Sequence, residues 1–152
     1  MPISGQAVVT NTGVARMINS LITGKSFVVD RFVVGDAGHD PLDPTLAITP
    51  DPSRDGCYCS VPAIDVAGGC IFADVVDEVI ESATCPVFRC ILGPGEATGV
   101  VTSICLIATI VYSPDPLDPE IGTQFCFAIA NYPFRAKAPG DTFEFEIGIQ
   151  VV

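Results

Sequence analysis

The chain has 152 residues, of which 49% are hydrophobic and 16% are charged, and its formal net charge at pH 7 is -11. A chain of this length buries roughly two-thirds of its unfolded surface in one core, which predicts a single domain over residues 1–152. The composition argues against nucleic acid as a partner, because polyphosphates need clustered Lys and Arg and the seven basic residues are scattered. With so few charged residues, we expect neighbouring subunits to cover part of the apolar surface.

Residues 1–13 contain neither a basic stretch nor a long apolar one, so we expect no signal peptide. The longest apolar run, 100–112, is too short to span a bilayer and is rich in Val, Ile and Thr. We therefore expect a protein that is made in a cytosol and does not bind a membrane.

Residues 10–24 show helical spacing of their apolar side chains. The side chains at this spacing are Val14, Met17, Ile18, Leu21 and Ile22. Thr10 or Thr12 can cap the N-terminus of a helix, and Gly24 can end it. This pattern predicts one amphipathic helix whose apolar stripe packs on a sheet.

From residue 26 onward the apolar period changes to two, which is typical of strands. The expected strands are 27–34, 70–80, 87–92, 100–112, 124–130 and 142–152. Both faces of 100–112 are apolar, which predicts a central strand covered on both sides, whereas 142–152 alternates as a half-exposed strand does. The fold class is therefore α+β and mainly β, with one N-terminal helix packed on an antiparallel sheet or sandwich of six to seven strands. The β region extends over 57–152.

Residues 36–56 are rich in Pro and Asp and can form neither a helix nor a central strand. Loops of this length are usually functional, so we interpret the segment as an arm that reaches a neighbouring protein. The candidate interface residues in it are His39, Asp40, Pro41, Leu42, Asp43 and Pro44. The sequence DPLDP occurs here and again at 115–119 with different flanks, which indicates shared loop chemistry and not a duplicated half.

The same arm could hold calcium, because hard cations bind several carboxylate oxygens from one flexible segment. The carboxylates available are those of Asp36, Asp40, Asp43 and Asp51, but their spacing misses the EF-hand pattern. We interpret them as turn carboxylates and expect neither a metal site nor a cofactor. A calcium-dependent binding or adhesin module remains the alternative function.

Seven cysteines are many for a protein made in a cytosol, where thiols stay reduced. They are Cys57, Cys59, Cys70, Cys85, Cys90, Cys105 and Cys126. The C-x-C pair is a poor zinc chelate, so disulfides are the main expectation, with zinc and buried thiols as alternatives. The odd number leaves at least one cysteine unpaired or bonded to another chain.

The sequence offers little for catalysis. His39 is the only histidine and lies in the arm, and the glycine-rich stretch at 93–99 has no Lys to bind phosphate. We expect no catalytic residues and a protein that is not an enzyme, with a cysteine-dependent enzyme as a further rival.

Two sets of motifs occur, one in the N-terminal part of the chain and one in the C-terminal part. The first is Thr10 to Gly13 before a strand that ends in Phe32 to Asp36, followed by the Pro-rich arm. The second comprises Phe127, Ala128, Asn131, Tyr132, Pro133, Phe134, Lys137, Ile149, Gln150 and Val151. Together they resemble the N-terminal, virion-anchoring domain of bacteriophage tail-collar and tail-fibre proteins.

The resemblance implies a structural subunit of a phage virion, in the tail, baseplate, collar or neck, assembled in the host cytoplasm. Its partners would be other virion structural proteins and further copies of itself. The sequence ends at Val152 without a stalk or a receptor-binding tip, and its cysteine content is foreign to the family. We therefore expect an anchoring or covering subunit, and not the adhesin, stabilised by disulfides that form after release from the cell, some of them between subunits.

Overall fold

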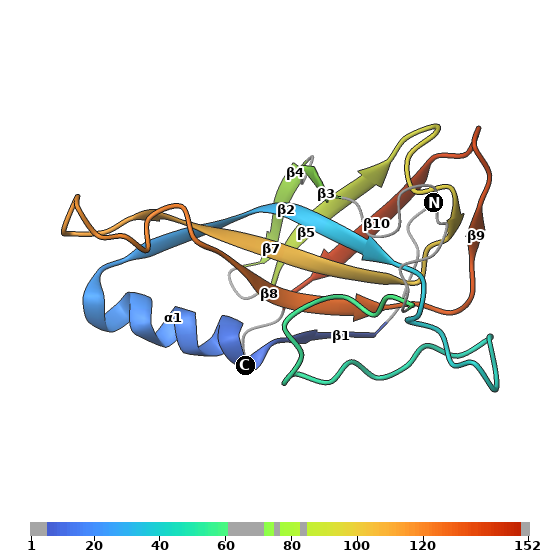
Figure 1. Ribbon diagram of the computed structural model, residues 1–152, viewed down its shortest axis with the longest axis horizontal. Coiled ribbons are helices and arrows are strands. Elements are labelled where there is room, and N and C mark those ends of the chain that lie inside the picture. The colour runs from blue at the N-terminus through green and yellow to red at the C-terminus, as the bar shows by residue number, and fades with distance from the viewer. Residues whose placement is uncertain (1–5, 61–71, 75–76, 83–84, 150–152) are drawn as a thin grey trace.

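The computed structural model describes residues 6–60, 72–74, 77–82 and 85–149. These residues contain one helix and ten strands, and all strand pairs are antiparallel (Figure 1). The elements are β1 (Gln6–Val9), α1 (Asn11–Thr23), β2 (Ser26–Gly35), β3 (Phe72–Asp74), β4 (Asp77–Ser82), β5 (Cys85–Leu92), β6 (Gly99–Val100), β7 (Ser103–Tyr112), β8 (Gln124–Asn131), β9 (Ala136–Lys137) and β10 (Phe143–Gly148). The expected mainly β fold with one N-terminal helix is confirmed, with more strands than the six or seven predicted.

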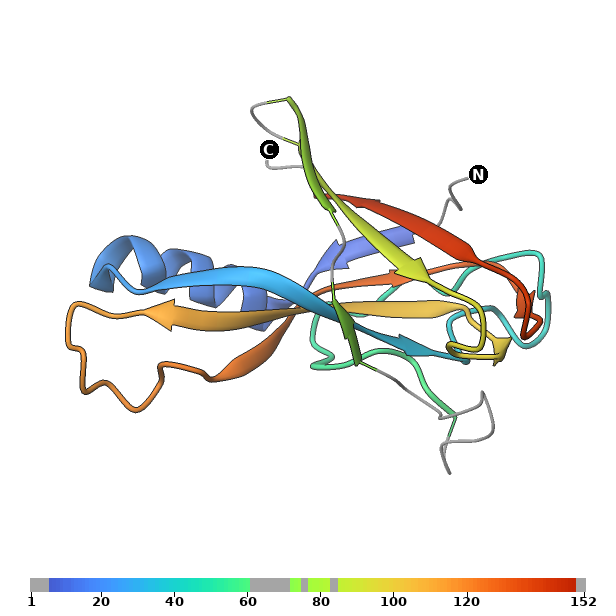
Figure 2. The same ribbon diagram turned by 90° about the horizontal axis from the view of Figure 1, so that it is seen from above.

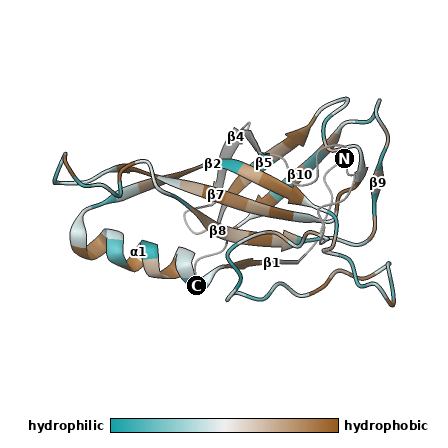
Figure 3. Ribbon diagram, in the orientation of Figure 1, coloured by the Kyte–Doolittle hydropathy of each residue, from teal (hydrophilic) through white to brown (hydrophobic). Residues whose placement is uncertain are grey.

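The strands form a five-stranded sheet in the order β1-β8-β7-β2-β3, a three-stranded sheet in the order β10-β5-β4, and the short pair β6-β9. Figure 2 shows α1 and the three-stranded sheet on the same side of the five-stranded sheet. The main hydrophobic core lies between them and includes Phe32, Phe88, Leu106 and Phe145. Figure 3 shows that hydrophobic residues follow the strands, while the long loops are more mixed.

β7 is the central strand that the sequence predicts. Ile104 and Leu106 contribute to the main core, whereas Cys105 and Ile107 belong to a smaller cluster on the opposite face of the sheet. The far end of the strand differs from the prediction, because Val111 and Tyr112 are exposed.

The alternation expected near the C-terminus is also present. Phe145, Ile147 and Ile149 are buried, while Glu144 and Glu146 are half-buried and face Arg89 on β5. The expected strand 70–80 is represented by β3 and β4, with 70, 71, 75 and 76 outside the described residues. β1 was not predicted, because four residues are too few to show a period.

The ends of α1 are those that its sequence predicts. The Thr10 hydroxyl accepts a hydrogen bond from the Gly13 amide, as an N-cap does, and Gly24 ends the helix in the left-handed region at φ 75°. The Gly24 amide donates to the carbonyl of Ser20. Local capping chemistry therefore fixes the length of the helix.

Candidate assembly interface

α1 lies on β8 through its smallest residue. A Cβ added to Gly13 would come within 2.5 Å of the carbonyl oxygen of Phe127. The buried Thr10 hydroxyl donates to the carbonyl of Cys126 at 2.6 Å, and the Thr10 amide donates to the carbonyl of Phe127 at 2.9 Å. The first turn of the helix is therefore held against the β8 backbone by direct contacts.

The apolar stripe of α1 faces away from the sheet. Val14 is 45% exposed, Ile18 54%, Leu21 88% and Ile22 79%, and Met17 alone in the stripe packs partly buried against the core. The prediction that the stripe packs on a sheet is thus wrong. With Gly13 against Phe127, the four exposed side chains lie roughly 80–180° around the helix from the contact with the sheet, so they point outward.

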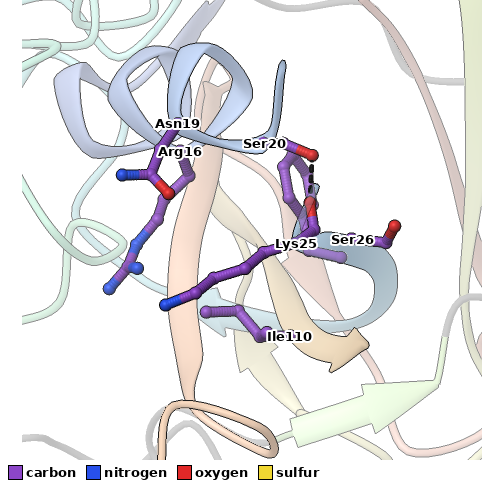
Figure 4. A pocket seen from close by; sticks show the side chains of 7 residues that line it. Arg16, Asn19, Ser20, Lys25, Ser26 and Ile110 are labelled. Carbon is purple, nitrogen blue, oxygen red and sulfur yellow. Dashed lines mark hydrogen bonds between the residues drawn. The ribbon is translucent and has the colours of Figure 1, made fainter. Parts of the chain in front are cut away.

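Ion pairs hold α1 in this rotation. Arg16 contacts Glu120 at 3.1 Å, and Lys25, just after the helix, contacts both Asp118 and Glu120 at 2.8 Å. In Figure 4 the charged groups of Arg16 and Lys25 end near each other, which agrees with their shared carboxylate. These contacts join the helix to the loop 113–123, which connects β7 to β8.

The same ion pairs shift the ionisation of their members. The hydrogen bond from Lys25 lowers the pKa of Asp118 to about 2, helped by the Glu120 amide and the Ser113 hydroxyl. Lys25 and then Arg16 lower the pKa of Glu120, and the hydrogen bond to Asp118 raises the pKa of Lys25. Lys25, Asp118 and Glu120 are therefore charged at neutral pH.

A hollow of about 360 Å³ opens beside the stripe. It is lined by Met17, Ser20, Leu21, Ser26 and Phe27, so it lies between the second half of α1 and the start of β2. Its lining is mainly apolar, and Leu21 both lines it and projects from the surface. Leu21 therefore projects from the surface directly beside an apolar hollow.

The Pro-rich arm is ordered by contacts with its own domain. The Gly38 amide donates to the Thr102 hydroxyl at 2.9 Å, and the Asn131 side-chain amide donates to the carbonyl of Ile48 at 3.1 Å. The Phe134 amide donates to the carbonyl of Pro44 at 2.7 Å, and the Phe134 ring meets the ring of His39 edge-on. The arm is therefore docked on the sheet that carries Asn131.

The predicted interface residues His39, Asp40, Pro41, Leu42, Asp43 and Pro44 form a turn at the tip of this arm. Asp40 accepts from the Leu42 amide, Asp43 accepts from the Thr45 amide, and Leu42 is 94% exposed. The second DPLDP segment repeats this pattern with Asp115 and Asp118 and leaves Leu117 87% exposed. Both copies therefore make the same turn, as the shared loop chemistry predicts. That the arm binds a neighbour stays a prediction.

The four carboxylates considered for calcium do not converge. Both oxygens of Asp36 accept from Ser60, and Asp51 accepts from the amide and hydroxyl of Ser53. Asp40 and Asp43 cap their own turns, and no three potential metal-ligating side chains cluster among the described residues. This geometry favours the interpretation of these residues as turn carboxylates.

One disulfide of the described residues joins Cys105 on β7 to Cys126 on β8, with their Cα atoms 6.3 Å apart. Cys59 is also disulfide-bonded, and the Cys57 sulfur lies 3.2 Å from the Cys59 sulfur. Cys90 is a thiol in the core, where burial raises its pKa to about 12. Cys70 and the side chain of Cys85 lie outside what the structure describes. Disulfides between subunits stay a prediction.

No helix in the described part of the chain is long and apolar enough to cross a lipid bilayer. No protein-family profile and no curated protein matches the sequence. The resemblance to phage tail-collar and tail-fibre proteins thus stays an expectation that depends on the motifs quoted above. The structure adds one feature that the sequence does not predict, which is the exposed apolar stripe of α1.

Proposed function

We propose that this chain is a structural subunit of a bacteriophage particle, in the tail, baseplate, collar or neck, and that it acts by binding other virion proteins. The observation that carries the proposal is the solvent-facing apolar stripe of α1. Four large aliphatic side chains lie together on it, and a contiguous patch of this kind marks a protein contact surface.

Leu21 and Ile22 are the two most exposed side chains of the stripe. Fully burying a Leu or Ile side chain contributes about 1.5–3 kcal/mol relative to leaving it in water. Leu21 and Ile22 are 88% and 79% exposed, so nearly all of that contribution is still available to a partner. Binding at this surface would stabilise an assembly without unfolding any of the domain.

Residues on which the phage resemblance depends lie where α1 and the Pro-rich arm attach to the five-stranded sheet. Thr10 and Gly13 hold α1 against β8, while Asn131 and Phe134 hold the arm. The residues that suggest a virion anchor therefore shape the surfaces that a neighbouring subunit would contact. This placement supports an anchoring or covering role and assigns no chemistry to the domain.

The proposal is tested on phage particles from the source of the gene. Antibodies against the purified chain are used to label gradient-purified particles for electron microscopy, and mass spectrometry measures its copy number relative to other particle proteins. We expect a fixed copy number and labels confined to the tail or neck. A chain that is expressed during phage production but is absent from finished particles would contradict the proposal.

A further inference from the structure

Resting on the assembly function proposed above, we infer that α1 binds a second copy of this chain. The contact is helix against helix and related by a two-fold axis, so that the same surface is used on both copies. Its centre is the second half of the helix, where Ile18, Leu21 and Ile22 project into solvent.

Shape on this surface is self-complementary. Leu21 and Ile22 project beside the hollow that Met17 and Phe27 line. Two-fold pairing gives each copy both a side chain to insert and a recess to receive one, which is the requirement of an isologous contact. A partner of another kind would have to supply both features separately.

Charge also favours a second copy at this place. Two chains of charge -11 repel each other, so they can approach only where carboxylates are absent or neutralised. The exposed stripe contains no ionisable side chain, and the nearby Asp118 and Glu120 are paired with Lys25 and Arg16. Because α1 itself contains no acidic residue, contact through its stripe brings no carboxylates of the two helices together.

The acidic arm lies away from the proposed centre. In Figure 1 the arm runs from beside the first turn of α1 toward the end of the molecule opposite the α1–β2 turn. The Asn11 amide donates to the carbonyl of Pro52, which places the near end of the arm at the start of the helix. Pairing through the second half of α1 thus leaves the part of the arm that runs toward the opposite end of the molecule outside the proposed contact.

The size of the contact surface indicates how strongly two copies of the chain should bind each other. A helix of 13 residues is about 20 Å long, so a contact centred on it is smaller than the standard interface of about 800 Å² per partner. We therefore expect a dimer with a dissociation constant on the order of micromolar. Many such contacts on one particle would reinforce each other.

The test is sedimentation equilibrium of the purified full chain without reductant at physiological salt, over a wide concentration range, with a non-reducing gel to identify any dimer that is linked by a disulfide. The substitution Leu21→Glu places a carboxylate at the centre of the contact and is expected to weaken dimerisation at least tenfold. Leu42→Glu is the matched control, because it makes the same change at a leucine that is 94% exposed on the arm. It should change the dissociation constant less than twofold, and circular dichroism confirms that each variant is folded.

A charge-swap experiment tests the two-fold geometry. Leu21→Lys alone should also be monomeric, and mixing it with Leu21→Glu should restore dimers, because position 21 of one copy then faces its counterpart. Monomers in the mixture would overturn the two-fold arrangement. A wild-type chain that stays monomeric up to hundreds of micromolar, or a Leu42→Glu loss as large as that of Leu21→Glu, would overturn the inference.

The two proposals can fail separately. A monomeric chain that is nevertheless present in particles at a fixed copy number would overturn the self-contact and leave the virion function intact. A dimer that is absent from particles would overturn only the virion function.

Discussion

The ammonium group of Lys25 lies 2.8 Å from the carboxylate of Asp118. This pair connects the end of α1 to the loop between β7 and β8, two segments that are more than ninety residues apart in sequence. The pair therefore ties the end of the helix to the loop, beside the ion pairs that Glu120 makes with Arg16 and Lys25.

Acid should weaken this connection in a defined pH range. The pKa of Asp118 is lowered from its ordinary value of 3.8 to about 2, so its contribution to stability is complete above pH 3.8 and is lost as the pH falls toward 2. The measurement is the thermal unfolding midpoint between pH 5 and pH 2. In Asp118→Asn the midpoint should be lower at pH 5 and should fall less steeply below pH 3.8 than in the wild type. Equal slopes would contradict the role of this carboxylate.

The ends of α1 could be predicted from the sequence, but its rotation could not. Thr10 and Gly24 act through hydrogen bonds within a few residues, so their capping role is readable from local spacing. The rotation depends on Gly13 meeting Phe127 and on Arg16 meeting Glu120, which are contacts more than a hundred residues apart in sequence. Periodicity identifies an apolar face but does not identify what covers it.

The pairing of Cys105 with Cys126 could not be predicted from the sequence either. In the first part of the β7–β8 register Cys105 faces Ile129, and continuing that register would place Cys126 on the opposite face from Cys105. A bulge between Leu106 and Ile107 shifts the register, so Cys126 pairs with Ile107 and turns to the face that carries Cys105. The bulge thus decides whether the sulfur atoms of Cys105 and Cys126 lie on the same face of the sheet.

Gly13→Ala should destabilise the domain, although alanine is ordinarily the better helix former. Its methyl group would meet the Phe127 carbonyl, and overpacking of this kind costs about 1–3 kcal/mol. The measurement is the free energy of unfolding in urea. Thr12→Ala, at an exposed position in the same turn, is the control and should lose nothing. A more stable Gly13→Ala variant would show that the contact is not tight.

Thr10 is expected to act through its hydroxyl group. Thr10→Ala removes both the cap on Gly13 and the hydrogen bond to Cys126, and it should lower the free energy of unfolding by about 1–2 kcal/mol. Thr10→Ser keeps the hydroxyl and should recover most of that loss. If Ser and Ala at position 10 were equally destabilising, packing of the threonine methyl group would be the cause instead.

The disulfide of Cys105 and Cys126 should stabilise the domain by about 3 kcal/mol, since it closes a loop with a sequence separation of 21. Reductant should lower the free energy of unfolding of the wild type by more than that of Cys105→Ala/Cys126→Ala. The difference isolates this disulfide, because Cys59 is disulfide-bonded in both proteins. An equal loss in both would mean that the sulfurs at 105 and 126 are not joined.

Removal of divalent cations should leave the domain unchanged. The carboxylates of Asp40, Asp43 and Asp51 accept hydrogen bonds from the amide two residues later and cap their own turns, while that of Asp36 accepts from Ser60. We therefore expect chelator to shift the melting temperature by less than about 1 °C, whereas a calcium-dependent module would lose several degrees through ligand linkage. The measurement is differential scanning calorimetry with EDTA and then with excess calcium.

The covalent link between β7 and β8 has a mechanical consequence. If the chain is stretched from its two ends, force passes from Cys105 to Cys126 through the sulfur atoms and bypasses the residues between them. That enclosed segment of about 20 residues would add on the order of 70 Å to the extended chain only after reduction. A chain under tension would thus keep the β7–β8 hairpin as a length that pulling cannot release.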